Sequence, residues 1–186
     1  MSQTGNIGFI GPVQGASLVK IMNGYEDGAK EVNADIKYQT AWTGSFTDTA
    51  LAKEAAQAMI DNGADVIGHC ANESGTGALN AAQDAGVLAT GDSYDQSSLA
   101  ENAVLSSAVY HVPELIKTAV SDIKEGKFKG EVKELGMAEG IVELVYNEKM
   151  AEEIPAEVKK LVDETEAKIK DGSFEVPCDT KDRAGK

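Results

Sequence analysis

The chain has 186 residues, 42% of them hydrophobic, which is enough for one domain with a sizeable core and argues against general disorder. Its 31 acidic and 17 basic side chains give a formal net charge of −14, and Arg183 is the only arginine. Nucleic acid and anionic membranes are therefore disfavoured as partners, because both need clustered cations, and two cysteines are too few for a disulfide scaffold.

The first hundred residues alternate short apolar runs with helical periodicity. Strands are predicted over Ile7–Ile10 and Ile36–Trp42, and two more begin at Asp65 and Val87. Apolar stripes between them predict helices over residues 18–32, 51–59 and 79–85. This βαβαβαβ order predicts a three-layer α/β fold of flavodoxin-like type, with a parallel sheet flanked by helices.

The pattern becomes mixed beyond residue 100. We expect a strand over Val104–Val109, a helix from Pro113 to about Lys124, strands over residues 131–137 and 141–146, and a last helix over residues 155–171. The tail from Ser173 is expected to be a surface segment. We therefore divide the chain into an α/β unit (residues 1–110), a helical segment (111–130), and strands and a final helix that complete the unit (131–186).

Ligands of open parallel sheets bind at the carboxyl ends of the strands, so the loops there are candidate site segments. These loops contain aromatic, amide, hydroxyl and carboxylate side chains, and no lysine or arginine. This inventory favours a flat, neutral or cationic ligand and disfavours a phosphate. Trp42 either packs in the core or faces the ligand, Phe46 is expected to face the ligand, and Asp48 is expected to cap the following helix.

The remaining polar candidates each have a structural alternative. Asn72 and Glu73 either contact the ligand or cap a helix locally. Asp92 and Asp95 either accept hydrogen bonds from ligand hydroxyls or are solvated turn residues.

An enzyme is the rival class. Gly68-His-Cys-Ala-Asn72 follows a strand and could form a nucleophile elbow around Cys70, with His111 as base and Glu114 as its orienting group. A buried structural cysteine is the default interpretation of Cys70. No spacing indicates a metal site, and no cofactor is expected.

Several motifs resemble one known family. They are, in chain order, Gly5-Asn-Ile-Gly-Phe-Ile-Gly-Pro, Asn23-Gly-Tyr-x-x-Gly-Ala-Lys, Gly44-Ser-Phe-Thr-Asp48, Ile60-Asp-Asn-Gly-Ala-Asp-Val-Ile67, Asp95-Gln-Ser, Gly126-Lys-Phe-Lys-Gly130 and Glu134-Leu-Gly-x-x-Glu-Gly140. In this order they resemble the basic membrane protein family of substrate-binding proteins for ABC transporters, which includes purine nucleoside and nucleobase binders. The resemblance implies a type I periplasmic-binding-protein fold with two lobes, and it begins at the first strand of the second lobe, so the first lobe is expected to be missing.

The resemblance also implies roles for individual residues. Phe46 would stack on the ring, Asn72 and its neighbours would approach the ligand, and the Asp92–Asp95 loop would receive ribose hydroxyls. Ser93 stands where nucleoside binders of the family usually carry Asp, and Tyr110 stands where they often carry a ribose-binding lysine. With Trp42, these departures resemble the nucleobase branch. The expected ligand-binding residues are Trp42, Phe46, Asn72, Glu73, Asp92, Ser93, Asp95 and Tyr110.

The resulting functional hypothesis is a lobe of the solute-binding component of an ABC importer, which binds a purine nucleobase or nucleoside without catalysis. The expected partners are an ABC permease and either the missing lobe or a second copy, because the apolar stripe of the helix over residues 113–124 would be exposed unless it folds onto its own sheet. The parent protein is expected to be periplasmic or a membrane-anchored lipoprotein, although residues 1–5 do not have the form of a signal peptide. The alternatives are a Cys70 hydrolase or amidotransferase and a regulatory or interaction domain derived from a binding protein.

Overall fold

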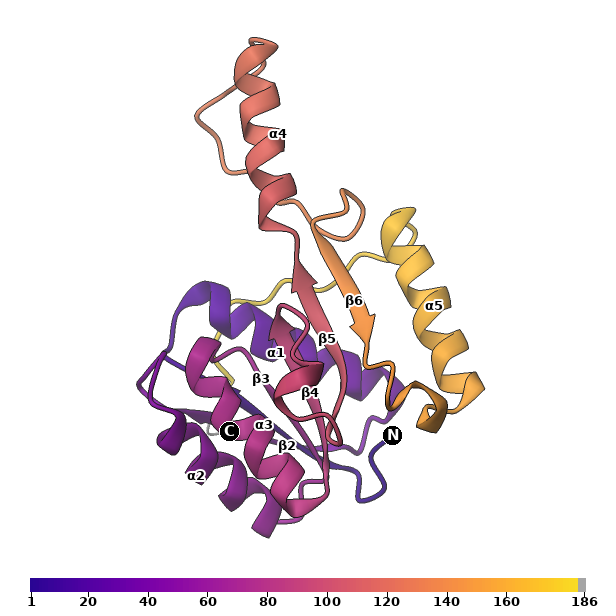
Figure 1. The fold of residues 1–186 in the computed structure, drawn as a ribbon. Coiled ribbons are helices and arrows are strands. Elements are labelled where there is room, and N and C mark those ends of the chain that lie inside the picture. The colour runs from indigo at the N-terminus through magenta and orange to yellow at the C-terminus, as the bar shows by residue number, and fades with distance from the viewer. Residues whose placement is uncertain (184–186) are drawn as a thin grey trace.

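The computed structural model describes residues 1–183, which form an α/β fold around one six-stranded sheet (Figure 1). The strands lie in the order β2-β1-β3-β4-β5-β6, and all but β6 are parallel. Their bounds are β1 Asn6–Gly11, β2 Lys37–Trp42, β3 Val66–His69, β4 Leu88–Ser93, β5 Val104–Tyr110 and β6 Val142–Tyr146. The predicted fold class is confirmed, with the addition that β6 runs antiparallel to β5.

Within residues 1–183, five helices and three short 3-10 turns accompany the sheet. The helices are α1 Ala16–Val32, α2 Thr49–Asp61, α3 Gly75–Ala85, α4 Val112–Lys124 and α5 Ala156–Lys170, and the turns are η1 Asn72–Ser74, η2 Ser97–Leu99 and η3 Ala151–Glu153. Of these helices, none combines the length and apolar character needed to cross a bilayer, a statement limited to residues 1–183. Residues 184–186 of the expected final segment lie outside the described range.

The larger apolar cluster lies between the sheet and helices α2 and α3. It is built from strand residues such as Ile10, Ile67 and Val104 and from Leu79 with many alanines of the two helices. A Cβ atom on Gly77 would lie 1.9 Å from the Thr49 carbonyl oxygen, so only glycine allows α2 and α3 to approach this closely. Small side chains therefore bring these two helices close together over one face of the sheet.

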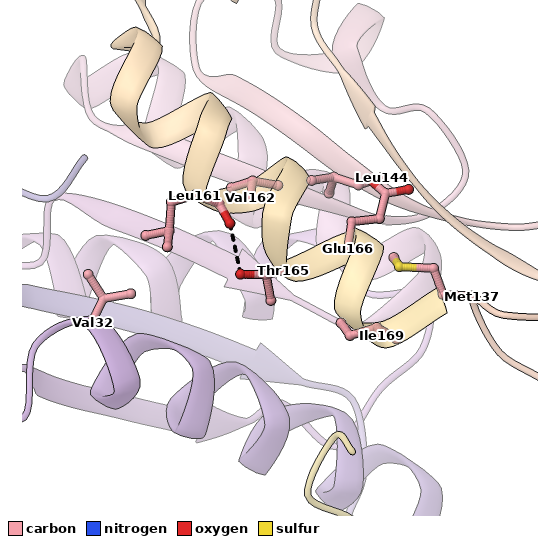
Figure 2. Close-up of a pocket in the computed structure, with 8 residues that line it drawn as sticks. All are labelled: Val32, Met137, Leu144, Leu161, Val162, Thr165, Glu166 and Ile169. Atoms are coloured by element: carbon pink, nitrogen blue, oxygen red, sulfur yellow. Dashed lines mark hydrogen bonds between the residues drawn. The ribbon is translucent and has the colours of Figure 1, made fainter. Parts of the chain in front are cut away.

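The opposite face carries α1 and α5. Phe9, Met22 and Cys70 form a second buried cluster under α1, and Leu105, Met150 and Ile154 form a third beside β6 and α5. A cavity of about 250 Å³ separates α1 from α5; it is lined by Val32 of α1, by Leu144 and Met137, and by a row of α5 side chains (Figure 2). The face is thus filled in two places with a hollow between them.

Helix α4 continues beyond the end of β5 and stands clear of the sheet (Figure 1). Every α4 residue, all within the described range, is at least partly exposed, and Ile116 and Ile123 are 59% and 61% exposed. The expected exposure of this apolar stripe is confirmed, and the alternative in which it folds onto its own sheet is not adopted.

The strand predicted over residues 131–137 is wrong. That segment is irregular and runs back along α4, where it shares a small hollow with Leu115 and Ala119, and Lys133 pairs with Asp122 of α4. A strand needs a neighbour to accept its hydrogen bonds, and β6 takes the edge position beside β5.

Candidate functional site

The parallel strands β1 to β5 all end at one edge of the sheet, so the loops that follow them lie along the same border. The predicted site residues lie in those loops or at the last positions of the strands. They form an aromatic pair at the end of β2 and in the loop after it, a polar group at the ends of β4 and β5, and a set of exposed turn residues.

The loop after β2 is fixed by local hydrogen bonds. Asp48 accepts from the N–H groups of Ala50 and Leu51 at 3.0 and 3.4 Å, so the prediction that it caps α2 is confirmed. The Phe46 carbonyl accepts from the Ser74 N–H at 2.9 Å, while the Phe46 ring is 43% exposed. The backbone is held on both sides of an aromatic ring that remains accessible at the strand-end border.

Trp42, the last residue of β2, packs against the cluster of Phe9, Met22 and Cys70. Its ring covers Gly11, where a Cβ atom would lie 2.3 Å from the indole Cζ3. The indole Nε1 is buried and has no hydrogen-bond partner among residues 1–183. Trp42 therefore has the packing expected of a core residue together with an unsatisfied donor.

Asp92 brings three of the predicted site residues together. It is 8% exposed, and its Oδ1 accepts from the Tyr110 hydroxyl at 3.0 Å while its Oδ2 accepts from the Ser93 hydroxyl at 2.7 Å. Burial, the charge of Asp92 and the hydrogen bond to Asp92 raise the pKa of Tyr110, so its hydroxyl stays protonated and donates at neutral pH. The result is a carboxylate with both oxygens held by neighbours in the same lobe.

A buried polar network, which the sequence did not predict, holds the main chain of Asp92. The Ala71 N–H donates to His69 Nδ1 at 3.2 Å, which places the ring proton on Nε2, and Nε2 in turn donates to Gln96 Oε1 at 2.9 Å. The same Gln96 oxygen accepts the Asp92 N–H at 2.9 Å, and the Gln96 N–H donates to Ser107 Oγ. Burial lowers the pKa of His69, against the opposing effects of the Asp92 charge and the Gln96 hydrogen bond, so the ring is neutral.

The other predicted site residues lie in exposed turns. Asn72 has a left-handed φ of 51°, and η1 has no side-chain cap within residues 1–183, so the capping alternative for Asn72 and Glu73 is not adopted. Asp95 accepts from the N–H and hydroxyl of Ser97 at 3.0 and 2.6 Å, and these bonds lower its pKa. Its contacts are those of a turn residue, as the alternative interpretation anticipated.

The residues expected for a cysteine enzyme, Cys70, His111 and Glu114, do not form a catalytic group in the structure. Cys70 is 3% exposed, and burial, with a smaller effect from the Asp92 charge, raises the pKa of its thiol to about 12. His111, the expected base, pairs instead with Glu143 of β6, with 2.7 Å between Nε2 and Oε2, and Glu114 pairs with Lys117. Cys70 therefore has the environment of a structural thiol.

The chain resembles known proteins over nearly its whole length. The family model for PnrA-like ABC transporter substrate-binding proteins matches residues 1–180. Basic membrane protein A2 of Borrelia garinii subsp. bavariensis is 36% identical over 181 residues, which cover 95% of this chain and 53% of that protein. A purine-binding protein of Brucella abortus is 33% identical (94% and 48% covered), and a nucleoside-binding protein of Lactococcus lactis subsp. cremoris is 32% identical (95% and 54% covered).

Solved structures share the fold. A solute-binding protein of an ABC transporter system from Aeropyrum pernix K1 superposes with a TM-score of 0.79 at 23% identity, covering 94% of this chain and 58% of that one. A Bacillus halodurans protein described as a transcriptional activator of the comK gene gives 0.82 at 24% identity, covering 94% and 59%. The chain spans about half the length of the curated relatives it matches, and by the family match it belongs to the PnrA-like ABC transporter substrate-binding proteins.

Proposed function

We propose that this chain is one lobe of the solute-binding component of an ABC importer and that it binds a purine base at the carboxyl edge of its sheet without chemical change. The observation that carries this proposal is the combination of an accessible aromatic ring, Phe46, and a buried carboxylate, Asp92, whose orientation is held by two hydrogen bonds, along one strand-end border. The names of the Brucella and Lactococcus relatives support a purine-type ligand.

The chemistry of the border fits a flat heterocycle. Phe46 offers an exposed face for stacking. The four loops after β1 to β4 contain no lysine or arginine, which disfavours a phosphate and therefore a nucleotide.

The hydrogen bonds of Asp92 bear on whether the ligand includes a ribose. Each of its oxygens accepts one hydrogen bond, from Tyr110 or Ser93, and keeps the capacity to accept a second, so Asp92 can still accept from a ligand hydroxyl or amino group. We favour a free base over a nucleoside because Ser93 and Tyr110 replace the Asp and the lysine that nucleoside binders of the family often carry.

The second lobe supplies the other half of the site in this proposal. Ligands of two-lobed binding proteins are enclosed by closure of the lobes, and affinity depends on contacts from both. The permease partner and an extracytoplasmic location follow from the same proposal.

The test is an NMR titration of the 186-residue chain with adenine, adenosine and adenosine monophosphate. We expect weak binding, with a Kd above about 0.1 mM, and amide shifts near Phe46, Asp92 and Tyr110 that are largest with adenine and smallest with the monophosphate. Phe46→Ala should abolish the shifts, whereas Phe128→Ala, which removes an exposed ring near the end of α4, should leave them unchanged.

Two results would contradict the proposal. If none of the three compounds shifts the amide signals at the strand-end border, the proposed site is wrong. If calorimetry shows that this chain alone binds with a micromolar Kd, a second lobe is not needed for binding.

A further inference from the structure

The last described residues of the chain return to α1 and are held there by a buried asparagine. Asn23, in the middle of α1, is 3% exposed, and its Nδ2 donates to the main-chain carbonyls of Asp179 and Lys181, both at 2.9 Å. A buried amide is costly unless it is hydrogen-bonded, and on this helix face Val19 and Met22 are the other buried residues. The two carbonyls of the tail satisfy that amide across 156 and 158 residues of sequence.

The only arginine of the chain makes the second attachment. Arg183 binds Asp27 of α1 in a fork, with Nη1 to Oδ1 at 2.5 Å and Nη2 to Oδ2 at 3.2 Å. Its Nη2 and Nε also donate to Asp179 Oδ2 at 2.9 and 3.1 Å, which folds residues 179–183 into a compact turn. Charge-assisted, two-point bonds of this kind are stronger than neutral ones and fix orientation.

A third contact links the tail to the strand-end border. Gln14, in the loop between β1 and α1, donates from Nε2 to Asp182 Oδ2 at 2.5 Å. The turn at residues 179–183 is thus attached to α1 at Asn23 and Asp27 and to the preceding loop at Gln14.

We propose that Asn23 and Asp27 form a docking site on α1 for the C-terminal segment of this chain, a turn that presents two main-chain carbonyls and one arginine. Asn23 selects for the backbone shape of the turn, and Asp27 selects for Arg183. The docked segment holds the β1–α1 loop through Gln14. This docking does not depend on the identity of the ligand.

The test is a ¹⁵N relaxation measurement on the full chain. Backbone order parameters of residues 179–183 should be about 0.8 in the unchanged protein and below about 0.6 in both Asn23→Ala and Arg183→Gln. The Gln14 amide should also become more mobile in both variants. Lys181→Gln is the matched control, because it removes one positive charge from the same segment and keeps the main-chain carbonyl that Asn23 binds; its order parameters should stay near 0.8.

Arg183→Gln is the decisive variant, since it lies at the surface and leaves α1 intact even if Asn23→Ala destabilises that helix. The proposal is overturned if the tail is already mobile in the unchanged chain, if it stays ordered in Arg183→Gln, or if Lys181→Gln loosens it as much as Arg183→Gln does.

Discussion

Residues 1–110 and residues 111–183 differ in where their apolar side chains lie. In the first region, every helix buries residues against the sheet, and one cluster runs from Ile10 through Leu79 to Val104. In the second, α4 and α5 are amphipathic, yet all of their residues, which fall within the described range, remain at least partly exposed. Amphipathic sequence therefore specifies a helix in both regions, but burial also requires a facing surface, and for α4 the described chain does not provide one.

The sharpest test of this comparison is one substitution made in each region. Leu79 is fully buried in α3 and Leu115 is 41% exposed in α4. Leu79→Ala should lower the free energy of unfolding by about 2–5 kcal/mol because it leaves a cavity. Leu115→Ala should change it by less than about 0.5 kcal/mol. Urea denaturation measures both, and equal losses would show that α4 shares the core.

The two cysteines, one in each region, should differ in their rate of chemical modification. Cys178 is exposed, whereas Cys70 is buried with its thiol pKa raised to about 12. A thiol reagent at pH 8 should modify Cys178 at least about a hundredfold faster than Cys70, because the thiolate is the reactive form. Cys178→Ser isolates the slow reaction. Faster labelling of Cys70 in the folded chain would instead revive the enzyme alternative.

The exposed face of α4 should drive self-association. Replacing Ile116 and Ile123 together by glutamate places charge on that face, and the association constant should fall by about tenfold or more while stability is unchanged. Lys117→Glu, on the same helix, is the control for added negative charge. Sedimentation velocity measures the change. If the unsubstituted chain is monomeric at high concentration, the expectation of self-association is wrong.

The smallest expected effect is a pH dependence from His69. Burial lowers the pKa of His69 in the folded state, so as pH falls below about 6.5 the unfolded chain binds a proton that the folded chain does not. Stability should therefore decline from pH 7 toward pH 5.5. His69→Asn should flatten this slope. A slope unchanged in His69→Asn would place the proton uptake elsewhere.

Local patterns predicted most of the fold and part of the site. The alternation of apolar runs and helical stripes up to residue 110 led to the correct strands and helices, and the position of Asp48 before α2 was enough to predict a cap. The strand expected over residues 131–137 failed because Val132, Leu135 and Met137 are apolar residues of a segment that follows α4 instead of joining the sheet.

Contacts between distant residues could not be predicted in this way. Asp92 and Tyr110 were both candidates, but their bond depends on the register in which Asp92 lies opposite Ala108. The roles of His69 and Gln96 depend on burial and on which ring nitrogen carries the proton. The tail, expected to be a simple surface segment, contacts Asn23 across 156 residues.

The antiparallel edge of the sheet has a consequence for protein engineering. Tyr110 lies opposite Val142, and the His111 N–H donates to the Ile141 carbonyl at 2.8 Å, so β5 and β6 are paired as in a β-hairpin. The connection of this hairpin is residues 112–140, which consist of α4 and the irregular segment that runs back along it. Residues 112–140 should therefore be replaceable by a short Asn-Gly turn without a change of strand register. The shortened chain would keep all six strands and lose the apolar face of α4, giving a minimal lobe whose fold can be checked by amide NMR.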